Sequence, residues 1–506
     1  MLNSNVDFKV PRELVMRNNS IEYDKPEYRD DFMRDRDRVL YSTAFRRLAG
    51  KTQIYTIDGN DHRRNRLTHT LEVAQIARTI SKALRLDENL TEAIALGHDL
   101  GHAPFGHAGE KILHEIMVCD STISLNKSIK ESPFNRINEK DFKDIYGFKH
   151  TVQSVRVATL IEDGYGENGL NLTNFTLWGM MNHSGIVYKE ETVDSKHIDP
   201  DYKNDLDKYI CHDNNEAWSF EAFVVREADE IAQWHHDMED ALYSNAMTPL
   251  QVANAINDNL SKMIENNIEM GKEISKIISE LSNSETHINL SMNQIITRLS
   301  RIIVNTLVTH IIKTSEKNME TLWKEFMEGK SRDEKIGFFN NSCFDELGTN
   351  KVKIKDTIGY ITFQGRHNGE DTSLRSYPKI IKLNIHHSQE VERMNAKGQY
   401  IIKKLFEAYS SHPQQLSDKM VVKYMKKIIK YSQEEILFDE KIISEIKGAL
   451  ENNIGAVRDV FEKVLVYRTE GKMPTKLQIE LMRSICDYIA SMTDGYAIKE
   501  YNNLYE

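Results

Sequence analysis

TEAIALGHDLGHAPFGHAGEKIL, residues 91–113, is the most informative stretch of this chain. It sets an imidazole beside a carboxylate at His98–Asp99 and brings two more histidines, His102 and His107, within ten residues of the first. Helix-breaking residues interrupt the stretch: Gly101, Pro104 and Gly106. They predict a tight bend rather than a continuous helix. Histidines gathered on a glycine-rich bend are poor core residues, so the pattern favours a metal site over a capping or surface accident.

The other expected metal ligands lie far from this bend in the sequence. His69 occurs upstream in RLTHTLEV, and Asp229 occurs downstream in READEIAQ. One His and one Asp from neighbouring helices would complete a cage of four ligands with His98 and Asp99. Such mixed nitrogen and oxygen sites suit Mn, Fe, Zn, Ni or Mg, and open coordination positions allow hydrolysis.

The helix expected over residues 218–245 carries a row of polar side chains. Asp229, Gln233 and Asp237 follow one another at four-residue intervals and therefore share a helix face. Apolar residues surround the start of this row: Phe220, Phe223, Val224 and Ile231. An inward-facing carboxylate needs a cation or hydrogen-bond donors. We therefore expect Asp229 to bind the metal and Asp237, two turns further, to face a substrate.

His107 and Glu110 are expected to form an acid–base pair. Their three-residue spacing lets the side chains touch on one helical turn, and a carboxylate both orients an imidazole and raises its pKa. The alternative is a histidine at a helix start with a glutamate that the helix dipole favours. His102 could support catalysis, contact a phosphate or donate to a metal ligand.

Three more residues could contact a substrate. Arg66 precedes His69 by one helical turn, so its forked donors could hold a metal-bound phosphate. His150, in GFKHTVQSV, and His183, in MMNHSG, could enter the same site. Each of these two histidines alone is more often structural.

Composition limits the class of protein. The net charge of −11 argues against general nucleic-acid wrapping, so a phosphate ligand would need a local basic site. The four cysteines, Cys119, Cys211, Cys343 and Cys486, show no paired spacing and predict a reducing compartment. The N-terminus shows no signal pattern, and no run approaches 18 apolar residues. We expect a cytoplasmic protein without a membrane partner.

The pattern of residues predicts an all-α protein, because helix-forming Lys, Glu, Ile and Leu dominate and only nine prolines occur. Helices are expected over 34–50, 66–86, 91–100, 250–282 and 286–329. The expected divisions are an irregular leader (1–30), a catalytic domain (31–248), a long-helix region for packing or oligomer contacts (249–344) and a mostly helical C-terminal region contributing to the substrate site and subunit contacts (345–506). A small strand-like excursion is expected over 345–378, and polar surface segments over 120–147 and 187–216.

Together these motifs resemble the HD-domain superfamily of metal phosphohydrolases, and more narrowly its bacterial deoxyguanosinetriphosphate triphosphohydrolase-like branch. The resemblance covers nearly the whole chain and is carried by seven stretches: RDRDRVLYSTAFRRLAGKTQIY, RLTHTLEVAQIAR, GHDLGHAPFGHAGE, FKHTVQSVR, READEIAQWHHDMEDA, VERMNAKGQYIIKKLFEAY and ICDYIASMTDGYA. The first three are highly specific in combination.

The resemblance implies a helical HD core with additional C-terminal helices. It implies His69, His98, Asp99 and Asp229 as ligands of a divalent metal, with Mn²⁺ or Mg²⁺ favoured over Fe, Ni or Zn. It further implies His107 and Glu110 as the catalytic pair. The implied substrate contacts are Arg66 and His150 near the α-phosphate, and Gln53 and Asp237 at the deoxyribose 3′-hydroxyl.

The implied reaction cleaves a deoxynucleoside triphosphate, possibly with a preference for dGTP, into deoxynucleoside and intact triphosphate. A homo-oligomer, hexameric in the family, and activation by a dNTP or single-stranded DNA are also implied. Gln233 stands where the family usually has a tyrosine against the sugar, so discrimination against a 2′-hydroxyl is open. Gly495 replaces a common arginine, and Glu230 replaces an aspartate.

Two alternatives remain from the sequence. Another HD phosphohydrolase could act on nucleoside monophosphates or cyclic nucleotides, and it would release different products. A regulatory protein that binds nucleotides or single-stranded DNA could carry a vestigial site. The complete set of ligands and acid–base residues argues against the second alternative, because binding alone does not need both.

Overall fold

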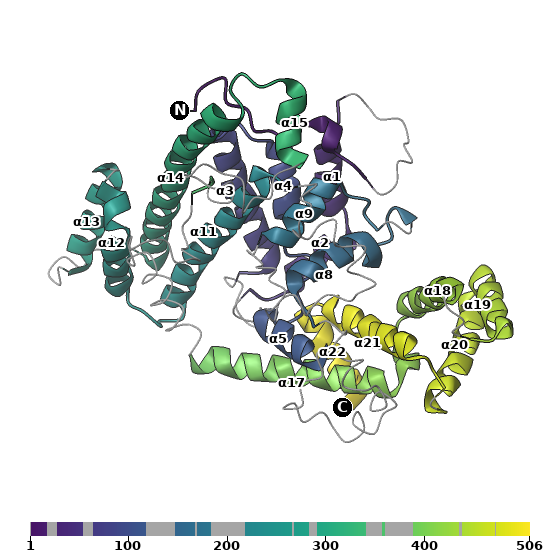
Figure 1. Cartoon of the computed structure of the whole chain (residues 1–506). Coiled ribbons are helices and arrows are strands. Elements are labelled where there is room, and N and C mark those ends of the chain that lie inside the picture. Colours follow the sequence, from purple (N-terminus) through teal and green to yellow (C-terminus); the bar gives the residue numbers. More distant parts are fainter. Residues whose placement is uncertain are drawn as a thin grey trace.

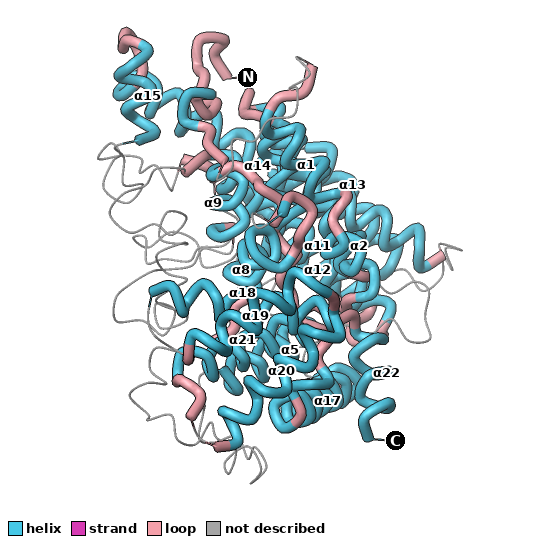
Figure 2. Tube along the Cα trace, turned by 90° about the vertical axis from the view of Figure 1, so that its right-hand side faces the viewer, coloured by secondary structure: helices cyan, strands magenta, loops and turns pink. Residues whose placement is uncertain are grey.

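A computed structural model describes residues 2–17, 28–53, 64–117, 147–166, 169–183, 218–265, 268–282, 291–340, 357–359, 388–434, 438–470 and 472–505. Helices make up nearly all the regular structure of these residues, and no strand occurs among them (Figures 1 and 2). Two isolated bridges, Arg17 with Thr173 and Thr52 with Asn65, are the β-type pairings in this part of the chain. The predicted all-α class is confirmed.

The first hydrophobic core lies among helices from the N-terminal half of the chain. They are α1 (Asp31–Leu40), α2 (Thr43–Arg47), α3 (Arg66–Ala83), α4 (Glu88–Gly97), α8 (His150–Arg156), α9 (Asn174–Asn182) and α11 (Phe220–Tyr243). Polar N-caps begin several of them, since Asp30, Asn65, Asp87 and Ser219 each accept a hydrogen bond from a backbone N–H of the first turn.

Long helices extend this first core. They are α12 (Pro249–Glu265), α13 (Ile268–Ser282), α14 (Met292–Phe326) and α15 (Arg332–Asn340). Helix α14 is apolar and long enough, by length and composition alone, to cross a membrane. Here its buried face packs against α11, α12 and α13, so the apolar stripe serves as core.

A second hydrophobic core joins α5 (Gly106–Met117) to the C-terminal helices. These are α17 (Gln389–Ser411), α18 (Asp418–Glu434), α19 (Glu440–Asn452), α20 (Ile454–Thr469), α21 (Thr475–Ala490) and α22 (Asp494–Tyr505). Figure 1 shows α5 directly above α17 and beside α22 and α21, and α5 contacts α17 and α21. The stretch 91–113 therefore runs from one core into the other.

Two expected helices are each divided in the structure. The helix expected over 34–50 ends at Leu40, and a new one begins after Ser42, whose hydroxyl accepts from the backbone N–H of Phe45. The helix expected over 250–282 is described as α12 and α13. In the first case a serine N-cap overrode an apolar periodicity that continues across the break.

The expected leader is irregular in backbone but takes part in the core. Leu2, Val6, Phe8 and Val10 are buried, and the Phe8 ring packs edge-on against Phe220 at a centroid distance of 5.2 Å. The expected surface segments over 120–147 and 187–216 lie almost entirely outside the described residues, as does nearly all of the strand-like excursion over 345–378.

Candidate metal centre and acid–base group

The bend after α4 is held against α8 by close backbone packing. A Cβ atom at Gly101 would lie 2.1 Å from the backbone nitrogen of Ser154, so only glycine fits there. The Ser154 hydroxyl accepts from the Gly101 N–H at 2.9 Å and donates to the His98 carbonyl at 2.7 Å. Phe105 and Gly106 then adopt left-handed backbone angles, with φ of 61° and 57°, before α5 begins. The predicted bend is confirmed.

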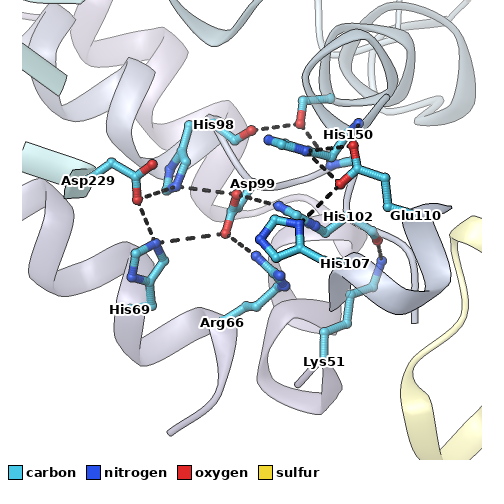
Figure 3. A network of polar contacts seen from close by, with 12 residues as sticks. Lys51, Arg66, His69, His98, Asp99, His102, His107, Glu110, His150 and Asp229 are labelled. Atoms are coloured by element: carbon cyan, nitrogen blue, oxygen red, sulfur yellow. Dashed lines mark hydrogen bonds and ion pairs between the residues drawn. The ribbon is translucent and has the colours of Figure 1, made fainter. Parts of the chain in front are cut away.

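Four residues from three helical regions converge beside this bend (Figure 3). We call His69, His98, Asp99 and Asp229 the His–Asp centre. The His69 Nε2 atom lies 3.0 Å from Asp229 Oδ1 and 4.0 Å from Asp99 Oδ2, and the His98 Nε2 atom lies 3.4 Å from Asp99 Oδ1 and 3.9 Å from Asp229 Oδ1. The structure thus brings together the four residues that the sequence singled out as candidate ligands.

The tautomer of His98 leaves a bare nitrogen facing the carboxylates. Its Nδ1 lies 2.6 Å from the Ala95 carbonyl oxygen, to which it must donate. The Nε2 atom is buried and has no hydrogen-bond partner among the described residues. An unpaired buried lone pair is costly, whereas a bound cation would satisfy it. This arrangement fits a divalent metal.

Hydrogen bonding behind His69 leads to the same conclusion. Glu72 can only accept when ionised, so His236 donates to it through Nε2. Burial, the largest influence, lowers the pKa of His236 well below its usual value, so the ring is neutral and its Nδ1 is an acceptor. His69 Nδ1, at 3.3 Å, then donates to it. With its proton on Nδ1, the His69 ring turns Nε2 toward Asp229 Oδ1, 3.0 Å away, where both atoms could bind one cation.

The two aspartates of the centre are ionised. Burial acts to raise the pKa of Asp99, but the nearby His98, His102 and Arg66 outweigh burial and hold the pKa well below its usual value. Asp229, whose side chain is 27% exposed, also has a lowered pKa, because the neighbouring His69 and His98 outweigh the opposing effect of burial. Anionic carboxylates at neutral pH are what a divalent cation requires.

Asp99 has two further partners. Arg66 donates through one terminal nitrogen to Asp99 Oδ2 at 2.7 Å, while its Nε is buried without a hydrogen-bond partner in the described part of the chain. His102 Nε2 lies 3.1 Å from Asp99 Oδ1 and donates to it. Burial, with Arg66 and His150 nearby, lowers the pKa of His102 well below its usual value. His102 is therefore a neutral donor that orients Asp99.

Glu110 is shared by two histidines. The expected partner, His107, places its Nδ1 3.5 Å from Glu110 Oε2, whereas His150 Nδ1 lies 3.0 Å from the same oxygen. The backbone N–H of His150 also donates to Glu110, at 3.2 Å. Burial opposes ionisation of Glu110, but His150 and His107 outweigh it and hold the pKa well below its usual value. We call His107, Glu110 and His150 the Glu110 group.

The two histidines of the Glu110 group differ in exposure. The His107 side chain is 67% exposed, while His150 is buried and its ring stacks on His102 at a centroid distance of 4.0 Å. The sequence paired Glu110 with its neighbour in α5. It did not reveal His150 as the closer partner, because forty residues separate the two.

The remaining expected substrate residues lie on α11, just after α9 and next to Gly106. Gln53 is partly buried, its side-chain oxygen has no hydrogen-bond partner among the described residues, and its backbone carbonyl lies beside Gly106. Asp237 is buried on α11, and Gln233 is partly buried one turn after Asp229. His183 is buried, with its ring centroid 4.9 Å from that of His98.

The C-terminal helices anchor the bend and the Gln53 segment. Asp494, at the start of α22, accepts from the backbone N–H of Thr52 at 3.0 Å and of Phe105 at 2.9 Å. The buried Lys51 donates to the His102 carbonyl (Figure 3) and to the Ala490 carbonyl. Burial lowers the pKa of Lys51 to about 7, since removing the ammonium from water disfavours its charge.

A buried ion pair ties α8 to α21. Arg156 donates to both Asp487 carboxylate oxygens, with the Nε contacts at 2.8 and 2.9 Å and a terminal nitrogen at 2.7 Å. Because α8 carries His150, this pair fixes one member of the Glu110 group relative to the C-terminal region. The second core therefore positions residues of the site in addition to stabilising the chain.

The sequence interpretation missed Glu72 and His236. A signal for them was present, because Glu72 follows His69 by three residues and His236 follows Asp229 by seven, which places each near the helix face of a ligand. A carboxylate–histidine chain behind a metal-binding imidazole is a common arrangement.

Comparisons with known proteins agree with this geometry. A family model described as HD domain matches residues 66–151, and one described as phosphohydrolase-associated domain matches residues 369–435 and 442–503. A deoxyguanosinetriphosphate triphosphohydrolase-like protein of Rhizobium etli (strain CIAT 652) is 42% identical over 230 residues, which cover 45% of this chain and 50% of the relative. The chain thus spans about half the length of this relative.

Longer matches carry the same name. A deoxyguanosinetriphosphate triphosphohydrolase-like protein of Bartonella tribocorum is 29% identical over 483 residues, which cover 94% of this chain and 90% of the relative. The corresponding protein of Bartonella henselae is also 29% identical over 483 residues. The similarity therefore extends through both hydrophobic cores.

Proposed function

We propose that this chain, which is an HD-domain phosphohydrolase similar over most of its length to deoxyguanosinetriphosphate triphosphohydrolase-like proteins, cleaves deoxynucleoside triphosphates into deoxynucleoside and inorganic triphosphate. One observation carries the proposal. The His–Asp centre lies beside the Glu110 group, so ligands for a cation and an imidazole–carboxylate pair face one region. Phosphoryl hydrolysis uses both, the first for charge on phosphate and the second for proton transfer.

The His–Asp centre would hold the divalent cation. A cation bound there supplies Lewis acidity, which lowers the pKa of a water molecule and neutralises charge on the α-phosphate. Mn²⁺ and Mg²⁺ are the ions we favour, with Fe, Ni or Zn as alternatives. His102 supports the site by donating to Asp99 and thereby fixing the direction of that carboxylate.

The Glu110 group would carry out the proton transfer to the leaving 5′-oxygen. A water oxygen attacks the α-phosphorus and releases one proton to solvent, the bond from that phosphorus to the 5′-oxygen breaks, and the 5′-oxygen takes a proton. His107 is the donor in this proposal, because its exposed ring can be reprotonated from solvent. The ionised Glu110 stabilises the protonated imidazole and keeps it oriented.

Four side chains would position the substrate. Arg66 keeps a donor without a partner in the described part of the chain and lies beside the centre, which suits an α-phosphate contact. A ring nitrogen of His150 lies within 4.8 Å of an Asp99 carboxylate oxygen, so His150 could contact the same phosphate. Gln53 and Asp237 would hold the 3′-hydroxyl. Gln233 and His183 are further candidates for contact, and an amide at position 233 would give weaker exclusion of a 2′-hydroxyl than a rigid aromatic ring.

The deciding experiment incubates the purified chain with each of the four dNTPs and Mn²⁺ or Mg²⁺, separately and mixed. Chromatography should show deoxynucleoside and inorganic triphosphate in equal amounts, and the Asp229→Asn variant should release neither. Release of monophosphate and pyrophosphate, or no turnover under any mixture, would contradict the proposal. Added single-stranded DNA and mixed dNTPs test for an activator, and size-exclusion chromatography tests the proposed homo-oligomer, hexameric by analogy with the family.

A further inference from the structure

A second group of ligand atoms lies between α3 and α11, against the edge of the His69 ring that faces away from Asp229. We call Glu72, His235 and His236 the outer cluster. One ligand atom of each lies within 4.8 Å of the other two. His236 Nε2 is hydrogen-bonded to Glu72 Oε2, and His235 Nδ1 lies 3.7 Å from the same oxygen. Two imidazoles and one carboxylate are a donor set that zinc and similar ions favour.

The side chains of the outer cluster are oriented from behind. Glu239, one helical turn after His235, lies with Oε1 3.0 Å from His235 Nε2 and accepts from it, so a neutral ring carries its lone pair on Nδ1. Arg64 lies 3.2 Å from the other Glu72 oxygen, Oε1, and 2.7 Å from Glu239 Oε2. Such partners fix the direction of metal-binding side chains. Here they turn His235 Nδ1 and Glu72 Oε2 toward each other.

The outer cluster has the charge and the access that a cation needs. Burial acts to raise the pKa of Glu72 and of Glu239, but hydrogen bonds with the neighbouring histidines outweigh burial and lower both pKa values. Both carboxylates are therefore ionised, against the single positive charge of Arg64. The Glu72 side chain is 36% exposed, whereas that of His236 is 2% exposed. An ion could thus enter past Glu72 without crossing the His–Asp centre.

We infer that the outer cluster is a zinc-type cation site whose occupation opposes metal binding at the His–Asp centre. An ion there takes the lone pair of His236 Nε2, and the proton of that nitrogen leaves to solvent. The Nδ1 atoms of His236 and His69 are 3.3 Å apart and share one hydrogen, which moves to His236. His69 Nε2 then takes a proton from solvent and donates to Asp229. A protonated Nε2 has no lone pair for the ion of the His–Asp centre.

The two parts of the inference depend on different premises. The outer cluster could bind an ion whatever the chain catalyses. The antagonism rests on the proposed function, since it acts through the metal ion of the His–Asp centre. An excess of Zn²⁺ should then lower turnover by removing that ion, without competing with the substrate.

A competing arrangement makes His235 itself the cation of the outer cluster. Burial acts to lower the pKa of His235, but Glu239 and Glu72 outweigh burial and raise the pKa. A protonated His235 would balance the two carboxylates by an ordinary ion pair. This arrangement predicts that the outer cluster binds no zinc, which separates it from the inference.

The first measurement isolates the outer cluster. In the full chain, Asp99→Ala/Asp229→Ala removes both carboxylates of the His–Asp centre, and calorimetry after stripping with EDTA should still show one Zn²⁺ bound per chain. Adding His235→Ala should weaken that binding by more than about 10-fold, and so should His235→Gln, which keeps a donor for Glu239. No zinc bound by the double variant, or equal binding with and without His235, would overturn the site.

The second measurement uses the intact His–Asp centre. Zn²⁺ is added to the Mn²⁺-loaded chain, and released Mn²⁺ is followed by electron paramagnetic resonance. His235→Ala and His235→Gln should bind Mn²⁺ as the native chain does but need at least about 10-fold more Zn²⁺ for release. His412→Ala, which alters an exposed histidine at the end of α17, should behave like the native chain.

The outcomes of the second measurement are distinct. Equal release from the native chain and the His235 variants would show that zinc displaces Mn²⁺ directly, and it would overturn the antagonism. Failure of the proposed function appears separately, as absence of triphosphate release from the Mn²⁺-loaded chain before any zinc is added.

Discussion

His69 and His236 face each other through their Nδ1 atoms, which lie 3.3 Å apart. Glu72 lies on the far side of His236 and accepts from its Nε2. The three side chains form a line that ends at the His69 nitrogen facing Asp229. This line sets which His69 nitrogen carries the proton, and so it prepares the other nitrogen to bind a cation.

Glu72→Ala should therefore weaken metal binding. Glu72 acts on the candidate ligand His69 indirectly, through its hydrogen bond with His236. Without the Glu72 carboxylate, His236 can move its proton to Nδ1. It then no longer accepts from His69 Nδ1, so His69 is no longer held in the tautomer whose Nε2 carries no proton. We expect the affinity for Mn²⁺ to fall by about 10- to 100-fold in calorimetric titrations of stripped protein. Glu72→Gln, which keeps an acceptor, should recover part of the loss, and Glu115→Ala on α5 is the control. Native affinity in Glu72→Ala would contradict the assigned line.

Gly101→Ala should destabilise the chain because its Cβ would lie 2.1 Å from the Ser154 nitrogen. Relieving that overlap requires α8 to move away from the bend, at a cost of about 1–3 kcal/mol or more. Urea unfolding followed by circular dichroism measures the loss. The matched control is Gly448→Ala in α19, where no atom lies within 4 Å of the added Cβ. There the helix propensity of alanine should stabilise by up to about 1 kcal/mol. Equal effects at both positions would refute the packing argument.

His107→Gln should separate catalysis from metal binding. Loss of a general acid lowers kcat by about 100- to 10,000-fold, while the His–Asp centre is untouched and should bind Mn²⁺ normally. The measurement is steady-state release of triphosphate together with metal content. Turnover within a few-fold of the native rate would assign the proton donor elsewhere, with His150 the next candidate because it is closer to Glu110.

Glu221 should make stability depend on pH. Burial raises its pKa from 4.5 to about 8 in the folded chain, so the native state keeps a proton that the unfolded state releases. Its contribution to stability is complete below the unfolded pKa and is lost as the pH rises through about 8. Between about pH 5 and 8 the native chain should lose stability relative to Glu221→Gln, by up to about 1.4 kcal/mol per pH unit. If the urea unfolding midpoints of the two proteins change with pH in the same way across that range, the pKa of Glu221 is not raised.

Asp494→Ala should weaken the attachment of the Gln53 segment and of the bend to α22, although Asp494 lies far from both in the sequence. It removes the acceptor for the Thr52 and Phe105 backbone N–H groups, which leaves buried donors unpaired at about 1–3 kcal/mol. We expect a lower thermal midpoint and a raised KM for the dNTP, because Thr52 precedes Gln53. Asp459→Ala, at an exposed position of α20, serves as the control. An unchanged KM with a lowered midpoint would limit Asp494 to a structural role.

Helical periodicity and helix-breaking residues were enough to predict the all-α class and the bend at residues 98–106, because both depend on local backbone preferences. The same local reasoning was wrong at Ser42, where one side-chain cap ended a helix that the apolar pattern continued. It predicted an irregular N-terminal segment, but it gave no sign that Phe8 of this segment is buried against Phe220. Such contacts depend on which surface a segment covers, and periodicity does not contain that information.

The sequence by itself determined the candidates for metal binding: the His–Asp dipeptide on a glycine-rich bend, a histidine one helix earlier and an inward aspartate on a later helix. Their types and spacings are properties of single helices, so they can be read from the chain alone. Only the tertiary structure decided that Glu110 contacts His150 more closely than His107, that Glu72 and His236 support His69, and that Asp494 anchors Thr52 across 442 residues of sequence. The Glu110–His150 and Asp494–Thr52 contacts arise where the two cores meet, whereas the Glu72–His236–His69 contacts arise between α3 and α11 within the first core. All of them depend on how whole helices pack.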